Sequence, residues 1–283
     1  MSLDALIIGA DSLIGSALMA EHKKLGISVA GTSRRSNSES IPLDLSRLSN
    51  IENLPAANNI YLCAGINSFN ACELDPVNTK RINIDANFLI ADYYLRKKSH
   101  IFFLSSTAVF GSKKEAPNED EEASPNTLYG ECKLAAELGL IKLSQQYAGK
   151  LSIIRLTKVL SKQSELIQKW LTQAANQEPI QAFKDLFIAP ISLNYLVHQL
   201  LKITEASQMG TFHLSGEKLI NYYELGQLLF KEWGSDALVM PVEQSRTKGV
   251  IVQPQCNILS MNQTIERLGI VQQSVQNFVK DMH

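Results

Sequence analysis

The first part of the chain alternates short apolar runs with segments whose apolar residues recur every three or four positions. The apolar runs are rich in β-branched residues and bounded by turn residues, which predicts strands. The predicted strands are Leu3–Ile8, Ser28–Thr32, Asn59–Cys63, His100–Ser105 and Leu151–Leu156. The predicted helices between them are Ile14–Leu25, Arg81–Lys97 and Leu128–Tyr147. Such alternation over residues 1–160 predicts an α/β fold with a doubly wound parallel sheet.

The alternation becomes less regular beyond residue 160. Helical patterns cover Glu165–Asn176, Leu193–Thr204, Tyr222–Trp233 and Asn262–Leu268. Two short strands, Phe187–Ala189 and Thr211–Leu214, could return to the main sheet. We therefore expect two domains: residues 1–160, with returning strands near 185–215, and a smaller C-terminal α/β domain over residues 161–283.

Composition excludes several classes of protein. The 283 residues carry 27 Lys and Arg against 28 Asp and Glu, so no strong field favours nucleic acid or an anionic membrane. Four scattered cysteines without a CxxC pair predict reduced thiols, and five histidines without ligand spacing predict no metal site. A basic signal-like start and a membrane-length apolar segment are both missing from the sequence. We expect a cytoplasmic protein that has no nucleic-acid or membrane partner.

A glycine-containing turn follows the first predicted strand and leads directly into a helix. Gly9 would allow the tight turn, and Gly15 would let helix and strand pack closely. The helix N-terminus would offer amide groups to a pyrophosphate, as in the Rossmann dinucleotide fold. Ser12 stands where a middle glycine is usual, which predicts a slightly wider approach of the ligand. A purely structural strand–helix turn is the alternative.

The end of the second strand indicates which dinucleotide would bind. An NAD-binding chain usually has an acid here, whereas this chain has Arg34 and Arg35. Guanidinium groups can bind a 2′-phosphate, with Thr32 and Ser33 as further donors, so NADP(H) is favoured over NAD(H). An exposed basic turn is the other interpretation. Asp44, after a third short strand, could accept from the adenine amino group or cap a helix from Ser46 onward.

Candidate catalytic groups lie on one helix and at the end of one strand. Tyr129 and Lys133 are four residues apart, hence on the same helical face, where the ammonium group would stabilise the phenolate. Ser106 ends a buried strand, where it would bind a substrate carbonyl while Tyr129 donates a proton. Ser105 and Thr107 are alternatives to Ser106.

These motifs together resemble the extended short-chain dehydrogenase/reductase family, and within it the dTDP-4-dehydrorhamnose reductases. The resemblance covers the whole chain. Its matching stretches are Gly9–Gly15, Cys63–Gly65, Asn83, Ser105–Phe110, Pro125–Lys133, Arg155–Val159, Asp185–Pro190 and Gly210–Leu214. Lys158 departs from the pattern, because the rhamnose reductases usually carry a tryptophan there. The lysine could meet a more anionic sugar or a nucleotide phosphate, or it could be a solvated residue at a strand end.

The resemblance implies NADPH-dependent reduction of a nucleotide-linked 4-keto sugar. Ser106 would bind the carbonyl, Tyr129 would be the acid and Lys133 its partner, with Thr107 and Lys158 as further substrate contacts. The expected cofactor-binding residues are Gly9, Ser12, Leu13, Ile14, Gly15, Thr32, Ser33, Arg34, Arg35, Asp44, Leu45, Cys63, Ala64, Gly65, Asn83, Tyr129, Lys133 and Leu156. The resemblance does not specify the sugar or its carrier nucleotide, and it is compatible with a homodimer.

Two other functions remain compatible with these residues. An epimerase or dehydratase would retain NAD and recycle it within one turnover, although such enzymes generally need an acid after the second strand. A non-catalytic NADP-binding regulatory subunit would use the same fold without chemistry. Two further features suggest structural roles: Glu119–Glu122 is expected to be a solvated acidic loop, and Trp170 and Trp233 are expected to lie in the core.

Overall fold

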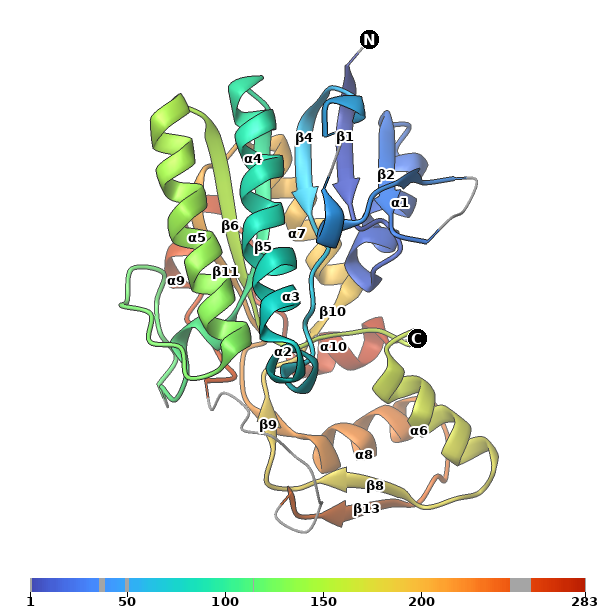
Figure 1. Ribbon diagram of the computed structural model, residues 1–283. Coiled ribbons are helices and arrows are strands. Elements are labelled where there is room, and N and C mark those ends of the chain that lie inside the picture. The colour runs from blue at the N-terminus through green and yellow to red at the C-terminus, as the bar shows by residue number, and fades with distance from the viewer. Residues whose placement is uncertain (1, 36–38, 49–50, 114, 245–255, 283) are drawn as a thin grey trace.

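The computed structural model describes residues 2–35, 39–48, 51–113, 115–244 and 256–282 (Figure 1). Its centre is a seven-stranded sheet in the order β11-β6-β5-β4-β1-β2-β3, in which every neighbouring pair is parallel. The strands are β1 (Leu3–Ile8), β2 (Val29–Ser33), β3 (Ile41–Pro42), β4 (Ala57–Leu62), β5 (His100–Ser106), β6 (Lys150–Leu156) and β11 (Gly210–Leu214). The predicted α/β doubly wound fold is confirmed.

Helices cover both faces of this sheet. Figure 1 shows α4 (Ala86–Arg96) and α5 (Leu128–Tyr147) side by side on one face, with α7 (Leu193–Glu205) behind the other face, where α1 (Leu13–Lys24) also packs. Successive residues of a strand point to opposite faces. Accordingly, Leu6 packs in the cluster under α4 and α5, whereas Ile7 packs in the cluster under α1 and α7.

Only one of the two expected returning strands joins the main sheet. β11 pairs with β6, with Thr211 opposite Ile153. The prediction for Phe187–Ala189 is wrong, because β9 (Phe187–Ile188) pairs instead with β12 (Ile220–Asn221) in a separate antiparallel ribbon. Both edges of β6 are already taken by β5 and β11.

A smaller lobe lies beyond the carboxyl ends of the main strands (Figure 1). It contains α6 (Glu165–Ala175), α8 (Tyr222–Glu232), α10 (Val275–Asp281) and the parallel pair β8 (Ile180–Phe183) and β13 (Val239–Val242). Trp170 is buried in its apolar core, and Trp233 packs against that core. The other elements are η1 (Leu45–Arg47), η2 (Ile51–Asn53), α2 (Phe69–Leu74), α3 (Pro76–Lys80), η3 (Arg81–Asp85), η4 (Thr107–Phe110), β7 (Val159–Leu160), β10 (Ile191–Ser192) and α9 (Asn262–Leu268).

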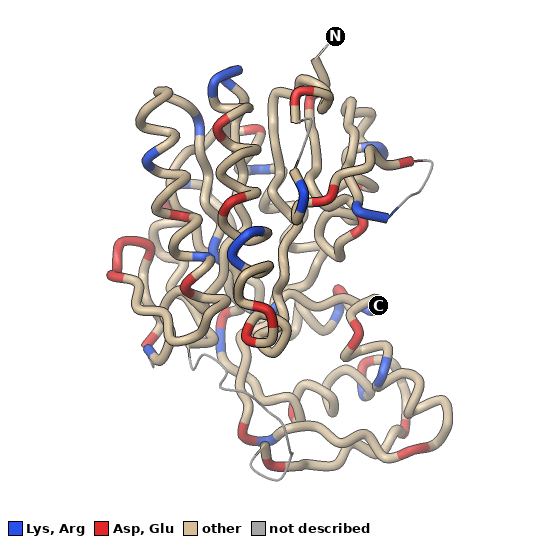
Figure 2. The backbone as a smooth tube through the Cα atoms, in the orientation of Figure 1, with Lys and Arg blue, Asp and Glu red and all other residues tan. Residues whose placement is uncertain are grey.

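Charged residues of both signs are interspersed over the molecule, as Figure 2 shows. One exception to the expected solvation is Glu119, which is buried. Its Oε1 accepts hydrogen bonds from the amide and the hydroxyl of Thr264, at 3.2 and 2.6 Å. The prediction of a wholly solvated acidic loop is therefore wrong, because Glu119 links that loop to α9 through these hydrogen bonds.

All four cysteines are free thiols. None of the helices in the described ranges is long and apolar enough to span a membrane.

Candidate active site

The turn after β1 is built around two closely packed glycines. Gly9 has a φ of 87°, which favours glycine, and a Cβ added there would lie 2.6 Å from Cβ of Ala64. A Cβ added to Gly15 would lie 2.1 Å from the Gly9 carbonyl oxygen. Because neither position has room for a side chain, strand and helix approach as closely as a dinucleotide-binding turn requires.

Ser12 is the N-cap of α1. Its hydroxyl accepts a 3.0 Å hydrogen bond from the Gly15 amide and donates one of 2.8 Å to the Gly9 carbonyl. The serine thus organises the turn in addition to replacing a glycine. Helix geometry leaves the amides of Leu13 and Ile14 without intrahelical acceptors, and both residues line the cavity described below.

The basic end of β2 is exposed, whereas the hydroxyl residues before it are buried. Nε of Arg35 lies 3.8 Å from a carboxylate oxygen of Asp11, and the Arg34 side chain is exposed. Thr32 accepts a hydrogen bond from the Gly9 amide at 3.2 Å, and Ser33 accepts one from the Arg35 amide at 2.9 Å. The two hydroxyls therefore shape the loop from which the two guanidinium groups project.

Asp44 serves as a helix cap. Its carboxylate accepts hydrogen bonds from the Ser46 amide at 2.9 Å and the Ser46 hydroxyl at 2.7 Å, at the start of η1. These bonds, together with the positive charge of Arg34, hold the pKa of Asp44 below its usual value. Of the two sequence interpretations, the structure supports capping. An adenine contact through Asp44 stays a prediction.

Asn83 positions the loop after β4 rather than projecting freely. Its amide group donates to the Ile66 carbonyl and accepts from the Ile66 amide, both at 2.8 Å. Asn83 lies in the π-helical turn η3, which forms the first five residues of the helix predicted over Arg81–Lys97 and joins α3 to α4. A Cβ added to Gly65 would lie 3.0 Å from its side-chain oxygen. The predicted cofactor residue Asn83 thus fixes the backbone around Gly65.

The Ser106 and Tyr129 side chains both line one cavity, where the Ser106 hydroxyl is close enough to act on the pKa of the Tyr129 phenol. Ser106 ends β5, and its hydroxyl also accepts a 3.2 Å hydrogen bond from the Ala108 amide. Burial raises the pKa of Tyr129 to about 12, and the nearby Ser106 hydroxyl opposes that rise. Tyr129 is therefore a protonated phenol at neutral pH, as a proton donor must be.

Lys133 lies one helical turn after Tyr129 and is buried. Its ammonium group is 5.8 Å from the centroid of the Tyr129 ring and donates a 2.7 Å hydrogen bond to the Leu104 carbonyl. Burial lowers the pKa of Lys133 to about 8, and the nearby carboxylate of Glu137 opposes this shift. The structure thus brings together the three residues of the predicted triad.

The two alternatives to Ser106 have different environments. The Ser105 hydroxyl donates to Glu137, which also forms a 2.7 Å buried ion pair with Arg155. Its proton is therefore directed into this buried network. Thr107 is buried at the start of η4 and lines the cavity. Of the three hydroxyls, only that of Ser106 acts on the pKa of the Tyr129 phenol.

A cavity of about 600 Å³ joins these groups at the carboxyl edge of the sheet. Its wall combines the start of α1 with Cys63, Ser106, Tyr129 and Leu156. Lys158, whose side chain is exposed, lines it as well from the segment after β6, and partial desolvation lowers the pKa of its ammonium group. Lining residues from the smaller lobe include Tyr222, so the cavity lies between the two parts of the molecule.

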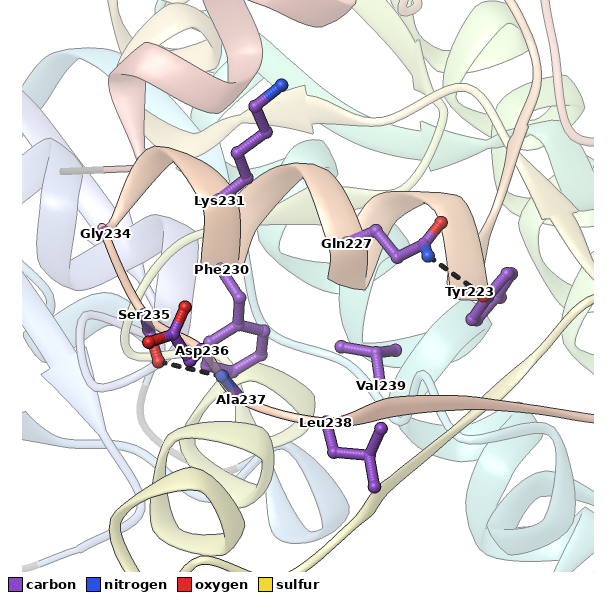
Figure 3. A pocket seen from close by; sticks show the side chains of 10 residues that line it. All are labelled: Tyr223, Gln227, Phe230, Lys231, Gly234, Ser235, Asp236, Ala237, Leu238 and Val239. Carbon is purple, nitrogen blue, oxygen red and sulfur yellow. Dashed lines mark hydrogen bonds between the residues drawn. The ribbon is translucent and has the colours of Figure 1, made fainter.

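A second hollow, of about 660 Å³, lies on the smaller lobe between α8 and the segment leading into β13 (Figure 3). Gln227 donates a 2.9 Å hydrogen bond to Tyr223 along α8, and Lys231 points away from Leu238 and Val239. The charged side chains of this hollow, Lys231 and Asp236, are exposed. It contains none of the predicted site residues, so the active site is assigned to the cavity at the sheet edge.

Comparison with known proteins agrees with this geometry. The family described as RmlD substrate binding domain matches residues 3–283. The chain belongs to this family. The predicted membership of the extended short-chain dehydrogenase/reductases is thereby confirmed. No curated protein matches the sequence.

Solved structures share the fold at low sequence identity. A dTDP-4-dehydrorhamnose reductase from Bacillus anthracis str. Ames, in complex with NADP, superposes with a TM-score of 0.87 at 19% identity over 99% of this chain and 98% of that one. The corresponding reductase from Clostridium acetobutylicum ATCC 824 gives 0.85 at 21% identity, over 98% and 97%. UDP-glucuronic acid 4-epimerase from Bacillus cereus, with UDP-glucuronic acid and NAD, gives 0.83 at 17% identity, over 98% and 97%. These similarities establish the fold, and the structural neighbours include a sugar-nucleotide reductase in complex with NADP and a sugar-nucleotide epimerase in complex with NAD.

Several residues of the site were not predicted from the sequence as functional. Glu137 lies four residues after Lys133, so the helical spacing that links Tyr129 to Lys133 could have revealed it. Thr157 lines the cavity from the family-like stretch Arg155–Val159, in which only Leu156 and Lys158 were given roles, and Tyr222 lines it from a segment without a distinctive local pattern. Only the three-dimensional fold brings them to the site.

Proposed function

We propose that the protein catalyses the NADPH-dependent reduction of a nucleotide-linked 4-keto sugar. The observation that carries this proposal is that Ser106 and Tyr129 line the same cavity at the sheet edge, with the Ser106 hydroxyl near enough to lower the pKa of the phenol. Lys133 lies one helical turn below, and the amides at the start of α1 face the same space. A carbonyl seated there would meet both hydroxyl groups.

The chemistry follows from what each side chain offers. The Ser106 hydroxyl would orient and polarise the carbonyl oxygen, and Tyr129 would donate its proton to that oxygen as negative charge develops on it. The Lys133 ammonium would stabilise the resulting phenolate electrostatically. NADPH, when bound, would supply the hydride that reaches the carbonyl carbon. Hydride and proton together convert the ketone to an alcohol, and solvent reprotonates Tyr129.

The proposed preference for NADPH rests on Arg34 and Arg35. Both project from the end of β2 beside the glycine turn and are exposed, so a 2′-phosphate could reach them. Asp11, 3.8 Å from Arg35, would lose that partner when the phosphate binds. The four free thiols favour a reducing compartment, so the proposed location is the cytoplasm.

Calorimetric titration with NADPH and NADH tests the cofactor. The wild type should bind NADPH more tightly, and Arg34→Ala combined with Arg35→Ala should remove that preference. Arg96→Ala, on the exposed surface of α4, is the matched control and should leave it intact. Failure to bind NADPH at millimolar concentration would overturn the proposal, and NAD retained through purification would favour an epimerase or dehydratase.

Turnover of a 4-keto sugar nucleotide tests the chemistry. Tyr129→Phe should reduce the rate of NADPH oxidation by roughly a hundred- to ten-thousandfold, because a general acid is lost. Its affinity for NADPH should change little. Unchanged turnover would mean that Tyr129 is not the acid. If the protein had no turnover and the substitution left its biological role unaffected, the regulatory-subunit interpretation would gain support.

A further inference from the structure

The cavity contains one charged side chain among its described lining residues, Lys158. No ion pair joins Lys158 to an acid within the described ranges, and Glu165 acts on it only through longer-range attraction. Acidic residues are missing from the described wall. A ligand in this cavity therefore meets a net positive charge at one defined place.

The neighbouring Thr157 presents a hydroxyl that has no partner. The residue is only 6% exposed, and its Oγ1 makes no hydrogen bond with the described protein. A buried hydroxyl without a partner costs about 1 to 3 kcal/mol, so natural sequences seldom retain one unless a ligand or water satisfies it. Thr157 lines the same cavity as Lys158.

The strand register places these two residues beside the reacting position. Ser106 of β5 is directly opposite Leu156 of β6, so Thr157 and Lys158 follow immediately beyond that level. In the sheet order, β6 lies on the opposite side of β5 from β4 and β1, which carry the cofactor turn. The hydroxyl and the ammonium therefore flank the sugar end of the site.

We propose that Thr157 and Lys158 form a subsite for a carboxylate on the sugar ring, so that the substrate belongs to the uronic-acid class of nucleotide sugars. A lone ammonium and an adjacent hydroxyl match the single charge and the acceptor oxygens of a carboxylate. A nucleotide diphosphate, which carries more charge, is the other anion that could reach Lys158. This inference rests on the proposed function and narrows its substrate class.

Calorimetry with matched sugar nucleotides tests the subsite. The probes are UDP-glucuronic acid, UDP-glucose and UDP, with the same three ligands in the deoxythymidine diphosphate series. In at least one series the wild type should bind the uronic acid about ten- to a hundredfold more tightly than the glucose form, as expected for a charge-assisted hydrogen bond. Lys158→Met should abolish that preference, whereas Lys169→Met, on the exposed surface of α6, should preserve it.

Thr157→Val separates binding from folding. The variant removes a hydroxyl that has no partner in the folded protein, so its free energy of unfolding should be unchanged or slightly higher. Its preference for the uronic acid should nevertheless fall, by about three- to tenfold. A loss of stability together with unchanged preference would show that the hydroxyl has only a structural role.

The remaining outcomes are equally decisive. Equal affinities for the uronic acid and glucose forms in the wild type, or no binding of either, would overturn the subsite. A loss of UDP and UDP-glucose affinity in Lys158→Met as large as the loss for the uronic acid would assign the ammonium to the diphosphate instead. NADPH titration of the same samples separates the two proposals, because cofactor binding does not depend on Lys158.

Discussion

The Lys133 ammonium group donates a 2.7 Å hydrogen bond to the main-chain carbonyl of Leu104, two residues before Ser106. This bond ties α5 to β5, the two elements that carry Tyr129 and Ser106. The hydrogen bond does not fully compensate for the hydration that the ammonium group loses on burial, since the pKa of Lys133 still falls to about 8. The site therefore holds its acid and carbonyl-binding groups together at a cost to the stability of the fold.

Replacing Lys133 with Met should raise the free energy of unfolding at pH 7, by up to about 3 kcal/mol. The pKa of Lys133 is about 8 in the folded protein against an ordinary value of 10.5. Below pH 8 both states are protonated and the full cost of burying the charge is present. Between pH 8 and 10.5 the unfolded chain binds the proton more strongly, so this cost fades as pH rises.

Urea unfolding at a series of pH values measures this effect. The stability difference between Lys133→Met and wild type should be constant below pH 8 and shrink toward pH 10.5. Lys142→Met, on the exposed face of the same helix, should change stability little at any pH. A difference that stayed constant across the whole range would mean that Lys133 is not the group responsible.

Local patterns in the sequence were sufficient to predict the elements that carry the catalytic groups. The helix over Leu128–Tyr147 has the predicted limits, because its apolar spacing and the capping Thr127 are both local signals. Ser106 could be placed near the reaction because strand ends meet at one edge of a parallel sheet. Within residues 1–160, the fold and the positions of the candidate catalytic groups were thus predictable from short stretches of sequence.

Contacts between distant segments could not be predicted in this way. Glu119 bonds to Thr264, which lies 145 residues away, and neither residue stands in a pattern that indicates the other. The Thr157 hydroxyl likewise has no hydrogen-bond partner in the folded protein, and no local pattern in the sequence indicates this. The π-turn around Asn83 begins a continuous helical pattern, and the Asn83 side chain bonds to Ile66 across the loop.

Ser12→Ala should destabilise the protein by about 1 kcal/mol, because it removes the hydroxyl that caps α1. Ser12→Gly should cost only a few tenths of a kcal/mol, since glycine is well tolerated at a helix N-cap. Thermal unfolding of the two variants and of Ser16→Ala, an exposed neighbour in the first turn, measures the difference. Equal losses from alanine and glycine would argue against the capping role.

Gly15→Ala should weaken NADPH binding by more than about tenfold, because the new Cβ would displace the Gly9 carbonyl, 2.1 Å away, and widen the turn. Ser16→Ala, at the next position, should bind the cofactor like the wild type. Calorimetric titration of both variants compares them directly. Undiminished NADPH affinity in Gly15→Ala would show that the cofactor does not depend on this turn.

Glu137→Gln should destabilise the protein by about 3 to 5 kcal/mol, because it leaves the buried guanidinium of Arg155 without its 2.7 Å partner. Glu21→Gln breaks an ion pair whose Lys24 partner is exposed, and it should cost less than about 1 kcal/mol.

The Glu137→Gln variant also tests whether Glu137 influences the active site, because the Glu137 carboxylate opposes the fall in the pKa of Lys133. Without that charge the Lys133 ammonium should lose its proton at lower pH. Because the proposed mechanism needs the protonated lysine, kcat should fall at high pH, and this fall should begin at lower pH in the variant than in the wild type. An unchanged pH profile alongside lost stability would confine Glu137 to a structural role. A shifted profile would make it a positioning residue for the catalytic lysine.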